Sequence, residues 1–168
     1  ESEISLKPSK IEKSGNNYQA EINVLNLEGN FYKIIITIPA YNEEKHIGKV
    51  IQEINLVMNK NNWYYQILVL DDGSTDNTKE IAINNGAKVV SNKIKLGLAK
   101  TFLREMEICK NLNADIIVHT DADGQYPPRY IPMMIESVLD GNDLVLGSRF
   151  GNGIYYGTIG KKLGNLFF

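Results

Sequence analysis

The sequence predicts an α/β fold with a mainly parallel sheet and helices on both of its faces. Short apolar runs alternate with amphipathic helical stretches from residue 33 onward. The runs are apolar on both faces, as is typical of parallel strands buried between two helical layers. Polar segments directly follow several of these runs, and open sheets of this kind bind ligands outside the carboxyl ends of their strands. Those segments are therefore the first places to look for a site.

The chain divides at about Lys33 into a polar extension and a regular domain. In the extension, residues typical of a turn at 14–17 precede an alternating pattern with apolar residues at Tyr18, Ala20, Ile22 and Val24. Residues 1–32 are therefore expected to be a hairpin, the end of an upstream module, or a segment foreign to the domain. Residues 33–168 are predicted to be one catalytic domain.

The first two strand-helix units of this domain have clear signals. A strand over 34–38 precedes a helix with one apolar face, formed by Ile47, Val50, Ile51, Ile54 and Met58. A second strand over 66–70 precedes a helix over about 77–85, which Gly86 ends. Asn77 and Glu80 resemble a capping pair for that helix. A short strand over 87–90 follows.

The remaining elements continue the alternation. A helix over about 97–110 is followed by a strand over 115–120. Pro128 opens a helix that Gly141 ends, and a last strand is predicted over 143–146. Cys109 is the only cysteine, and we expect it to pack in the core on the apolar side of its helix, with Leu98, Phe102 and Met106.

Composition excludes several classes of protein. The formal net charge is −2 and the pI about 5.7, so no basic field exists to attract nucleic acid. No apolar run is long enough for a membrane helix, and the first residues lack the pattern of a signal peptide. We therefore expect a cytoplasmic chain that handles any anionic substrate locally.

Three polar loops follow the first, second and fourth strands of the domain. They read Pro39-Ala40-Tyr41-Asn42-Glu43-Glu44, Asp71-Asp72-Gly73-Ser74-Thr75-Asp76 and Asp121-Ala122-Asp123-Gly124-Gln125. Parallel strands bring such loops to one sheet edge, where four aspartates would repel one another unless a cation or hydrogen bonds compensate them. The oxygen ligands Asp121, Asp123 and Gln125 favour Mg²⁺ or Mn²⁺. Without a cluster of cysteine and histidine, zinc is disfavoured.

Taken in order, these three loops resemble those of the family 2 glycosyltransferases. The similarity continues through Leu96-Gly97-Leu98-Ala99, Pro127-Pro128 and Gly147-Ser148-Arg149-Phe150, the last of which is similar to the polyprenyl-phosphate branch that includes dolichyl-phosphate mannose synthase. The resemblance implies the glycosyltransferase A-type, Rossmann-like fold. It also implies that the family's domain continues past Phe168, so that this one is truncated.

The resemblance assigns roles to particular residues. A nucleotide pocket would use Pro39, Ala40, Tyr41, Glu43, Asp71, Asp72 and Asp121. The ion would be held by Asp121, Asp123 and Gln125, and the catalytic residues would be Asp121, Asp123 and Arg149. Lys161 and Lys162 are weaker candidates for the acceptor phosphate. Phe102 and Lys95 depart from the glycine and asparagine common in relatives, and neither falls on the proposed chemistry.

The implied reaction is attack of an acceptor on the anomeric carbon of a GDP- or UDP-linked sugar, with inversion. The implied acceptor is a dolichyl or undecaprenyl phosphate, at the cytoplasmic face of a membrane. A sugar hydroxyl of a glycan is the alternative acceptor, and it would need a general base. His119 precedes the acidic motif, yet local packing or hydrogen bonding explains it better than catalysis, and His46 suits a solvated or capping position.

A response-regulator receiver domain is the alternative of another class. The strand that ends in Asp71 and Asp72 resembles the opening strand of a receiver, and Asp121 follows a later strand. This alternative leaves the loop from Pro39 to Glu44 unexplained, and places a full strand-helix unit before the acidic pair. In addition, the sequence has no late strand that ends in a lysine followed by proline, as a receiver domain does.

Overall fold

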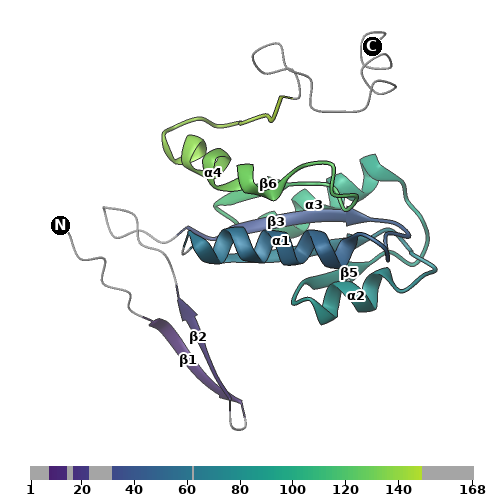
Figure 1. Cartoon of the computed structure of the whole chain (residues 1–168), viewed down its shortest axis with the longest axis horizontal. Coiled ribbons are helices and arrows are strands. Elements are labelled where there is room, and N and C mark those ends of the chain that lie inside the picture. The colour runs from purple at the N-terminus through teal and green to yellow at the C-terminus, as the bar shows by residue number, and fades with distance from the viewer. Residues whose placement is uncertain (1–7, 15–16, 23–31, 62, 149–168) are drawn as a thin grey trace, which may run out of the picture.

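The computed structural model describes residues 8–14, 17–22, 32–61 and 63–148 (Figure 1). Its main sheet has the strands β3 (Ile34–Ala40), β4 (Tyr65–Asp71), β5 (Lys88–Ser91) and β6 (Ile116–His119). They are all parallel, in the order β5-β4-β3-β6. The predicted α/β class with a parallel sheet is therefore confirmed.

Helices cover both faces of this sheet. They are α1 (Ile47–Lys60), α2 (Thr78–Asn84), α3 (Leu98–Asn111) and α4 (Ile131–Leu139), the last preceded by a 3₁₀ turn, Pro128–Tyr130. Residues of α1, α2 and α4 share one apolar cluster with the sheet, whereas Cys109 of α3 belongs to a second cluster on the opposite face. In Figure 1, α1 crosses in front of the sheet between α2 and α4.

The α1 face of the sheet holds most of the core. Alternate residues of β3, β4 and β6 point to it, and all five apolar residues predicted for the first helix are buried there. Full burial of a side chain of this size contributes about 2 kcal/mol. The opposite cluster is smaller, with Ile35, Leu68, Leu70 and Cys109 as its buried members. Burial raises the pKa of the Cys109 thiol to about 11, with a further contribution from the negative charge of Glu105, so core packing is confirmed for this cysteine.

The apolar face predicted for the third helix was wrong apart from Cys109. The buried residues of α3 are Thr101, Glu105 and Cys109, whereas Leu98 is 66% exposed and Phe102 39% exposed. Leu98 is the first residue of the helix, three positions before the first buried residue, Thr101. Phe102 instead meets the His119 ring edge to face, with centroids 5.1 Å apart.

Two further predictions were wrong. Residues 143–146 form no strand, because among the described residues no strand lies beside them to pair with, and Leu144 and Leu146 remain largely exposed. Asn77 and Glu80 do not form a capping pair, since Asn77 makes no side-chain cap to α2. Its side chain amide donates to Glu44 Oε2 instead, and the side chain of Asp76 accepts the N–H of Thr78.

A separate two-stranded antiparallel ribbon precedes the domain. It consists of β1 (Pro8–Ser14) and β2 (Asn17–Ile22). In the part of the chain that the structure describes, no helix is both long and apolar enough to cross a membrane.

Candidate functional site

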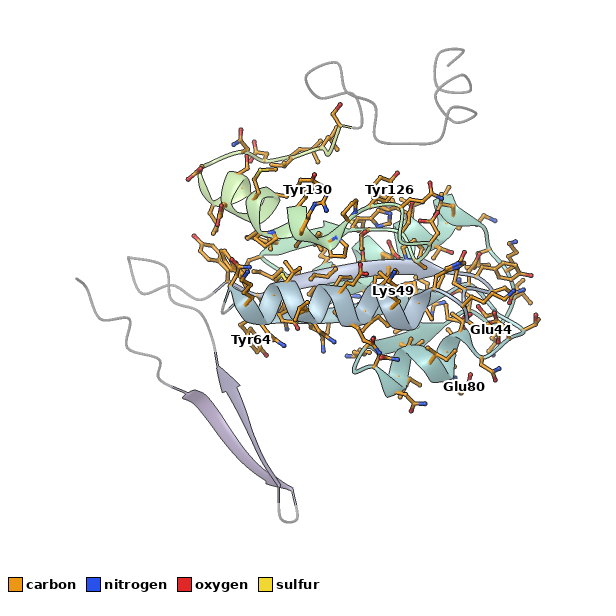
Figure 2. All side chains as sticks on the ribbon, in the orientation of Figure 1. Glu44, Lys49, Tyr64, Glu80, Tyr126 and Tyr130 are labelled. Atoms are coloured by element: carbon orange, nitrogen blue, oxygen red, sulfur yellow. The ribbon has the colours of Figure 1, made fainter. Side chains whose placement is uncertain are left out.

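Three polar loops meet at the carboxyl edge of the sheet because their strands run parallel. The ladder extends one residue beyond β3 and β4, where Asp72 N donates to Ala40 O at 2.8 Å and Asn92 N donates to Asp71 O at 2.8 Å. Thr120 N donates to Thr37 O at 3.1 Å and so brings the start of the acidic loop to the same edge. In Figure 2 the labelled Glu44 lies at this edge, with Tyr64 at the opposite end of the sheet.

The loop after β3 is fastened to the loop after β4 through Asn42. This residue has a φ of +54°, a left-handed conformation that asparagine tolerates better than most residues. Its backbone N–H donates to Ser74 Oγ at 3.0 Å, and its side-chain oxygen accepts the N–H of Thr75 at 2.8 Å. The two loops are thereby joined in both directions.

A second set of hydrogen bonds joins the same loops further along. Glu43 N donates to Thr78 Oγ1 at 2.7 Å, and Glu44 N donates to Asp76 Oδ2 at 3.2 Å. In return, Asn77 donates to Glu44 Oε2 from its backbone N–H at 3.2 Å and from its side chain at 3.1 Å. Burial alone would raise the pKa of Asp76, but hydrogen bonds from Thr78 and Glu44 outweigh it and hold the pKa below its ordinary value.

Asp71, the last residue of β4, and Asp72, which follows it, are buried and serve as hydrogen-bond acceptors. Asp71 Oδ1 accepts the N–H of Ser74 at 2.9 Å. Asp72 accepts the N–H groups of Leu96 and Gly97, each at 2.8 Å, and the side-chain amide of Asn92 at 2.7 Å. Burial raises the pKa of Asp72, but these donors lower it by more, so that it lies below its ordinary value.

Of the two expected ways of compensating the four aspartates, a cation or hydrogen bonds, the structure shows hydrogen bonds for Asp71 and Asp72. Among the described residues, no group of three or more His, Cys, Asp or Glu side chains is placed to hold a metal ion. Asp71 and Asp72 are compensated by N–H donors and need no cation for that purpose.

The acidic loop after β6 contains a turn between Asp123 and Gln125. Asp121 and Asp123 are half-buried, and Gly124 has a φ of +73°. Both oxygens of Asp123 accept hydrogen bonds from Gln125, one from its backbone N–H at 2.9 Å and one from its side chain. Two carboxylates and an amide suit Mg²⁺ or Mn²⁺, because such ions commonly combine one or two carboxylates with waters and substrate phosphates.

His119 is the last residue of β6, two positions before Asp121, and its ring contacts neighbouring elements of the fold. Its Nδ1 lies 3.2 Å from Thr37 Oγ1 and 3.0 Å from Oε2 of the fully buried Glu105. The ring therefore joins β6 to β3 and α3, in agreement with the local hydrogen bonding expected of it. His46 is exposed at the start of α1, with Nδ1 2.9 Å from Glu43 Oε2, as a solvated residue would be.

The structure brings together the predicted residues of the first and second loops. Pro39 and Ala40 end β3, and Ala40 is paired with Asp71 in the parallel ladder. Tyr41 and Glu43 follow the strand, and Glu43 N donates to Thr78 Oγ1. Arg149, Lys161 and Lys162 lie outside the described residues. Sequence reasoning missed the bridging roles of Asn42 and Thr78, which only the spacing of polar residues in the two loops could have suggested. It also missed Lys95, whose Nζ lies 3.6 Å from the centroid of the Tyr41 ring.

Comparison with known proteins gives related sequences in archaea. A dolichol-phosphate mannosyltransferase from Pyrococcus furiosus is 33% identical over 72% of this chain and 34% of its own length. A UDP-N-acetylglucosamine–dolichyl-phosphate N-acetylglucosaminyltransferase from Methanococcus voltae is 34% identical over 79% of this chain and 59% of its own. The chain thus spans less than two thirds of the length of each of these two relatives.

A solved structure is similar in fold and in sequence. Glucosyl-3-phosphoglycerate synthase from Mycobacterium tuberculosis, in complex with Mn²⁺, UDP and glucosyl-3-phosphoglycerate, superposes with a TM-score of 0.55 at 31% identity, covering 66% of this chain and 41% of that one. The family model for glycosyl transferase family 2 matches residues 35–165, which include all three polar loops. This match excludes the receiver alternative, and the chain belongs to glycosyl transferase family 2.

Proposed function

We propose that this chain carries the donor-binding part of a metal-dependent, inverting glycosyltransferase. The donor is a GDP- or UDP-linked sugar, and the acceptor is a polyprenyl phosphate at the cytoplasmic face of a membrane. We call the loops after β3 (residues 39–44) and β4 (residues 71–76) the nucleotide loops. The observation that carries this proposal is that these two loops, joined by hydrogen bonds, meet the acidic loop at a single sheet edge. The family membership and the relatives named for dolichyl-phosphate acceptors support it.

Each loop has its own part in donor binding. Pro39, Ala40, Tyr41 and Glu43 hold the base and ribose on a surface that the contacts of Asn42 keep in place. Asp71 adds a polar contact at the end of β4. Asp121 and Asp123, together with Gln125, hold the divalent ion beside the diphosphate. The similarity to a synthase solved with Mn²⁺ and UDP supports this arrangement.

The residues of the acidic loop serve the departure of the nucleotide. A divalent ion bound there supplies positive charge that stabilises the leaving nucleoside diphosphate. Arg149 provides a further fixed charge for a phosphate of donor or acceptor. A phosphate monoester, with a second pKa of about 6, is already largely an anion at neutral pH. Such an acceptor needs orientation rather than a general base, and for this Lys161 and Lys162 are the candidates.

Calorimetry tests the proposal on the chain as it is. UDP and GDP are titrated with and without Mn²⁺ into the parent, Asp123→Ala and Asp140→Ala, a control that removes an exposed carboxylate at the end of α4. We expect one of the nucleotides to bind the parent and the control equally. Asp123→Ala should lose the Mn²⁺-dependent part of the affinity, about 100-fold. A folded parent that binds neither nucleotide with Mn²⁺ present would overturn the proposal.

A further inference from the structure

The segment between β5 and α3, residues 92–97, is folded onto the nucleotide loops. Its backbone is anchored by Asp72, which accepts the N–H groups of Leu96 and Gly97. The side chain of Asn92 donates to the same carboxylate at 2.7 Å. Both oxygens of Asp72 are therefore directed at this segment, which indicates that its part in the site is to position residues 92–97 rather than to contact a nucleotide.

The backbone of the same segment also packs closely against Gly73. Gly73 has a φ of +77°, and a Cβ added there would lie 3.1 Å from the carbonyl carbon of Ile94 and 3.2 Å from the nitrogen of Lys95. Both contacts are with backbone atoms, which have little freedom to move aside. The Asp72-Gly73 pair thus determines where the backbone of Lys95 lies.

The side chain of Lys95 ends above a residue of the proposed nucleotide pocket. Its Nζ lies 3.6 Å from the centroid of the Tyr41 ring, within the range of a cation-π interaction. Within residues 32–61 and 63–148, no carboxylate lies within ion-pair distance of this ammonium. Both Lys95 and Tyr41 are exposed. A positive charge that lies over a ring, with no carboxylate beside it, is available to an anionic ligand.

We propose that Lys95 binds the diphosphate of the donor nucleotide, with Asp72 and Gly73 as the positioning residues that hold its loop. This inference rests on the proposed function, because it takes the donor to be a nucleoside diphosphate sugar at Tyr41. Lys95 approaches the donor from the β5–α3 side, whereas the acidic loop belongs to β6, on the other side of β3. The diphosphate is then neutralised from two sides, by an ammonium and by the ion.

The test compares nucleotides that differ only in phosphate number. The diphosphate and the monophosphate of the base that binds the parent are titrated into Lys95→Met, with Mn²⁺ present. We expect the affinity for the diphosphate to fall about 10-fold and that for the monophosphate to fall less, because the lost ammonium acts on the terminal phosphate. Lys95→Arg keeps the charge and should recover most of the loss. Lys93→Met removes an equally exposed lysine of the same loop and should stay within twofold of the parent.

The outcomes separate this inference from the proposed function. A parent that binds no nucleotide overturns both. A parent that binds a nucleotide, with Lys95→Met unchanged, overturns the role of Lys95 and leaves the proposed function standing. Equal losses for the diphosphate and the monophosphate would also overturn it, because they would place Lys95 at the base or the ring instead.

Discussion

The nucleotide loops and the acidic loop stand at the same sheet edge, yet their carboxylates are held in different ways. Asp72 accepts hydrogen bonds from residues 20 to 25 positions along the chain, and Glu44 bonds to a residue 33 positions away. Asp123, in contrast, accepts from Gln125, only two positions away. The partners of Asp72 and Glu44 are therefore brought to them by folding of the whole sheet, whereas Asp123 has its partner within its own turn. On the basis of the proposed function, we infer that ligand binding changes the acidic loop more than it changes the first two loops.

The largest expected effect of this difference is on stability. Asp72→Ala leaves three N–H donors without their charged acceptor and should lower the free energy of unfolding by about 3 kcal/mol. Asp123→Ala removes only contacts within its own turn and should cost less than about 1 kcal/mol. Urea unfolding measures both. Equal costs would show that the two regions are equally integrated into the fold.

A pair of glycines sharpens the comparison. Gly73 and Gly124 have nearly the same φ, +77° and +73°, so that alanine at either position is strained in the same way. A Cβ at Gly124 would lie 3.7 Å from Val50, an ordinary contact, whereas at Gly73 it would crowd the backbone. We expect Gly124→Ala to cost about 1 kcal/mol and Gly73→Ala about 2 kcal/mol. The same unfolding experiment checks this, and a greater cost at Gly124 would contradict it.

Acid should remove part of the stability that Asp72 provides. Because its pKa is lower in the folded chain than the ordinary value of about 3.9, its contribution is fully present above about pH 5. The contribution is lost as the pH falls through the lowered folded pKa. The difference in unfolding free energy between the parent and Asp72→Ala should therefore be constant from pH 7 to 5 and shrink below about pH 4. Ser74→Ala, which removes a hydroxyl from the same loops but no acid, should show a constant difference over the whole range.

The smallest expected effect is a change in local opening when ligand binds. With Mn²⁺ and the nucleoside diphosphate that binds, amide hydrogens of residues 122–125 should exchange several-fold more slowly, which corresponds to about 1 kcal/mol of added local stability. Those of residues 71–78 should change less than twofold, because their hydrogen bonds already exist in the free chain. Hydrogen exchange detected by mass spectrometry measures both segments at once. Equal slowing in both would show that the nucleotide loops are also completed by ligand.

Sequence periodicity predicted the sheet and its helices because burial controls both. The run Ile34–Ile38 and the five apolar residues of α1 fall where the core requires them. The prediction of a strand over 143–146 was wrong, because apolar composition does not reveal whether a neighbouring strand is present to pair with. The face of α3 was misplaced, because a buried Glu105 beside His119 reverses the ordinary expectation for a charged residue.

The candidate site was predictable in position but not in the use of each side chain. Strand ends located the three loops, and the order of their residues indicated the family. The sequence could not show that Asp72 faces the loop of Lys95, since that depends on hydrogen bonds between segments more than twenty residues apart. For the same reason the sequence could not show that the ammonium of Lys95 lies over the ring of Tyr41.

The position of Cys109 gives the protein a built-in reporter of unfolding. The thiolate is the form that reacts with alkylating and disulfide reagents, and a buried thiol with a pKa of about 11 supplies almost none at neutral pH. As the chain has no other cysteine, its modification by such a reagent requires α3 to separate from the sheet. The rate of labelling therefore measures how often α3 opens in the native protein. Because Cys109 is buried, a dye would react with a cysteine introduced at the surface in preference to it.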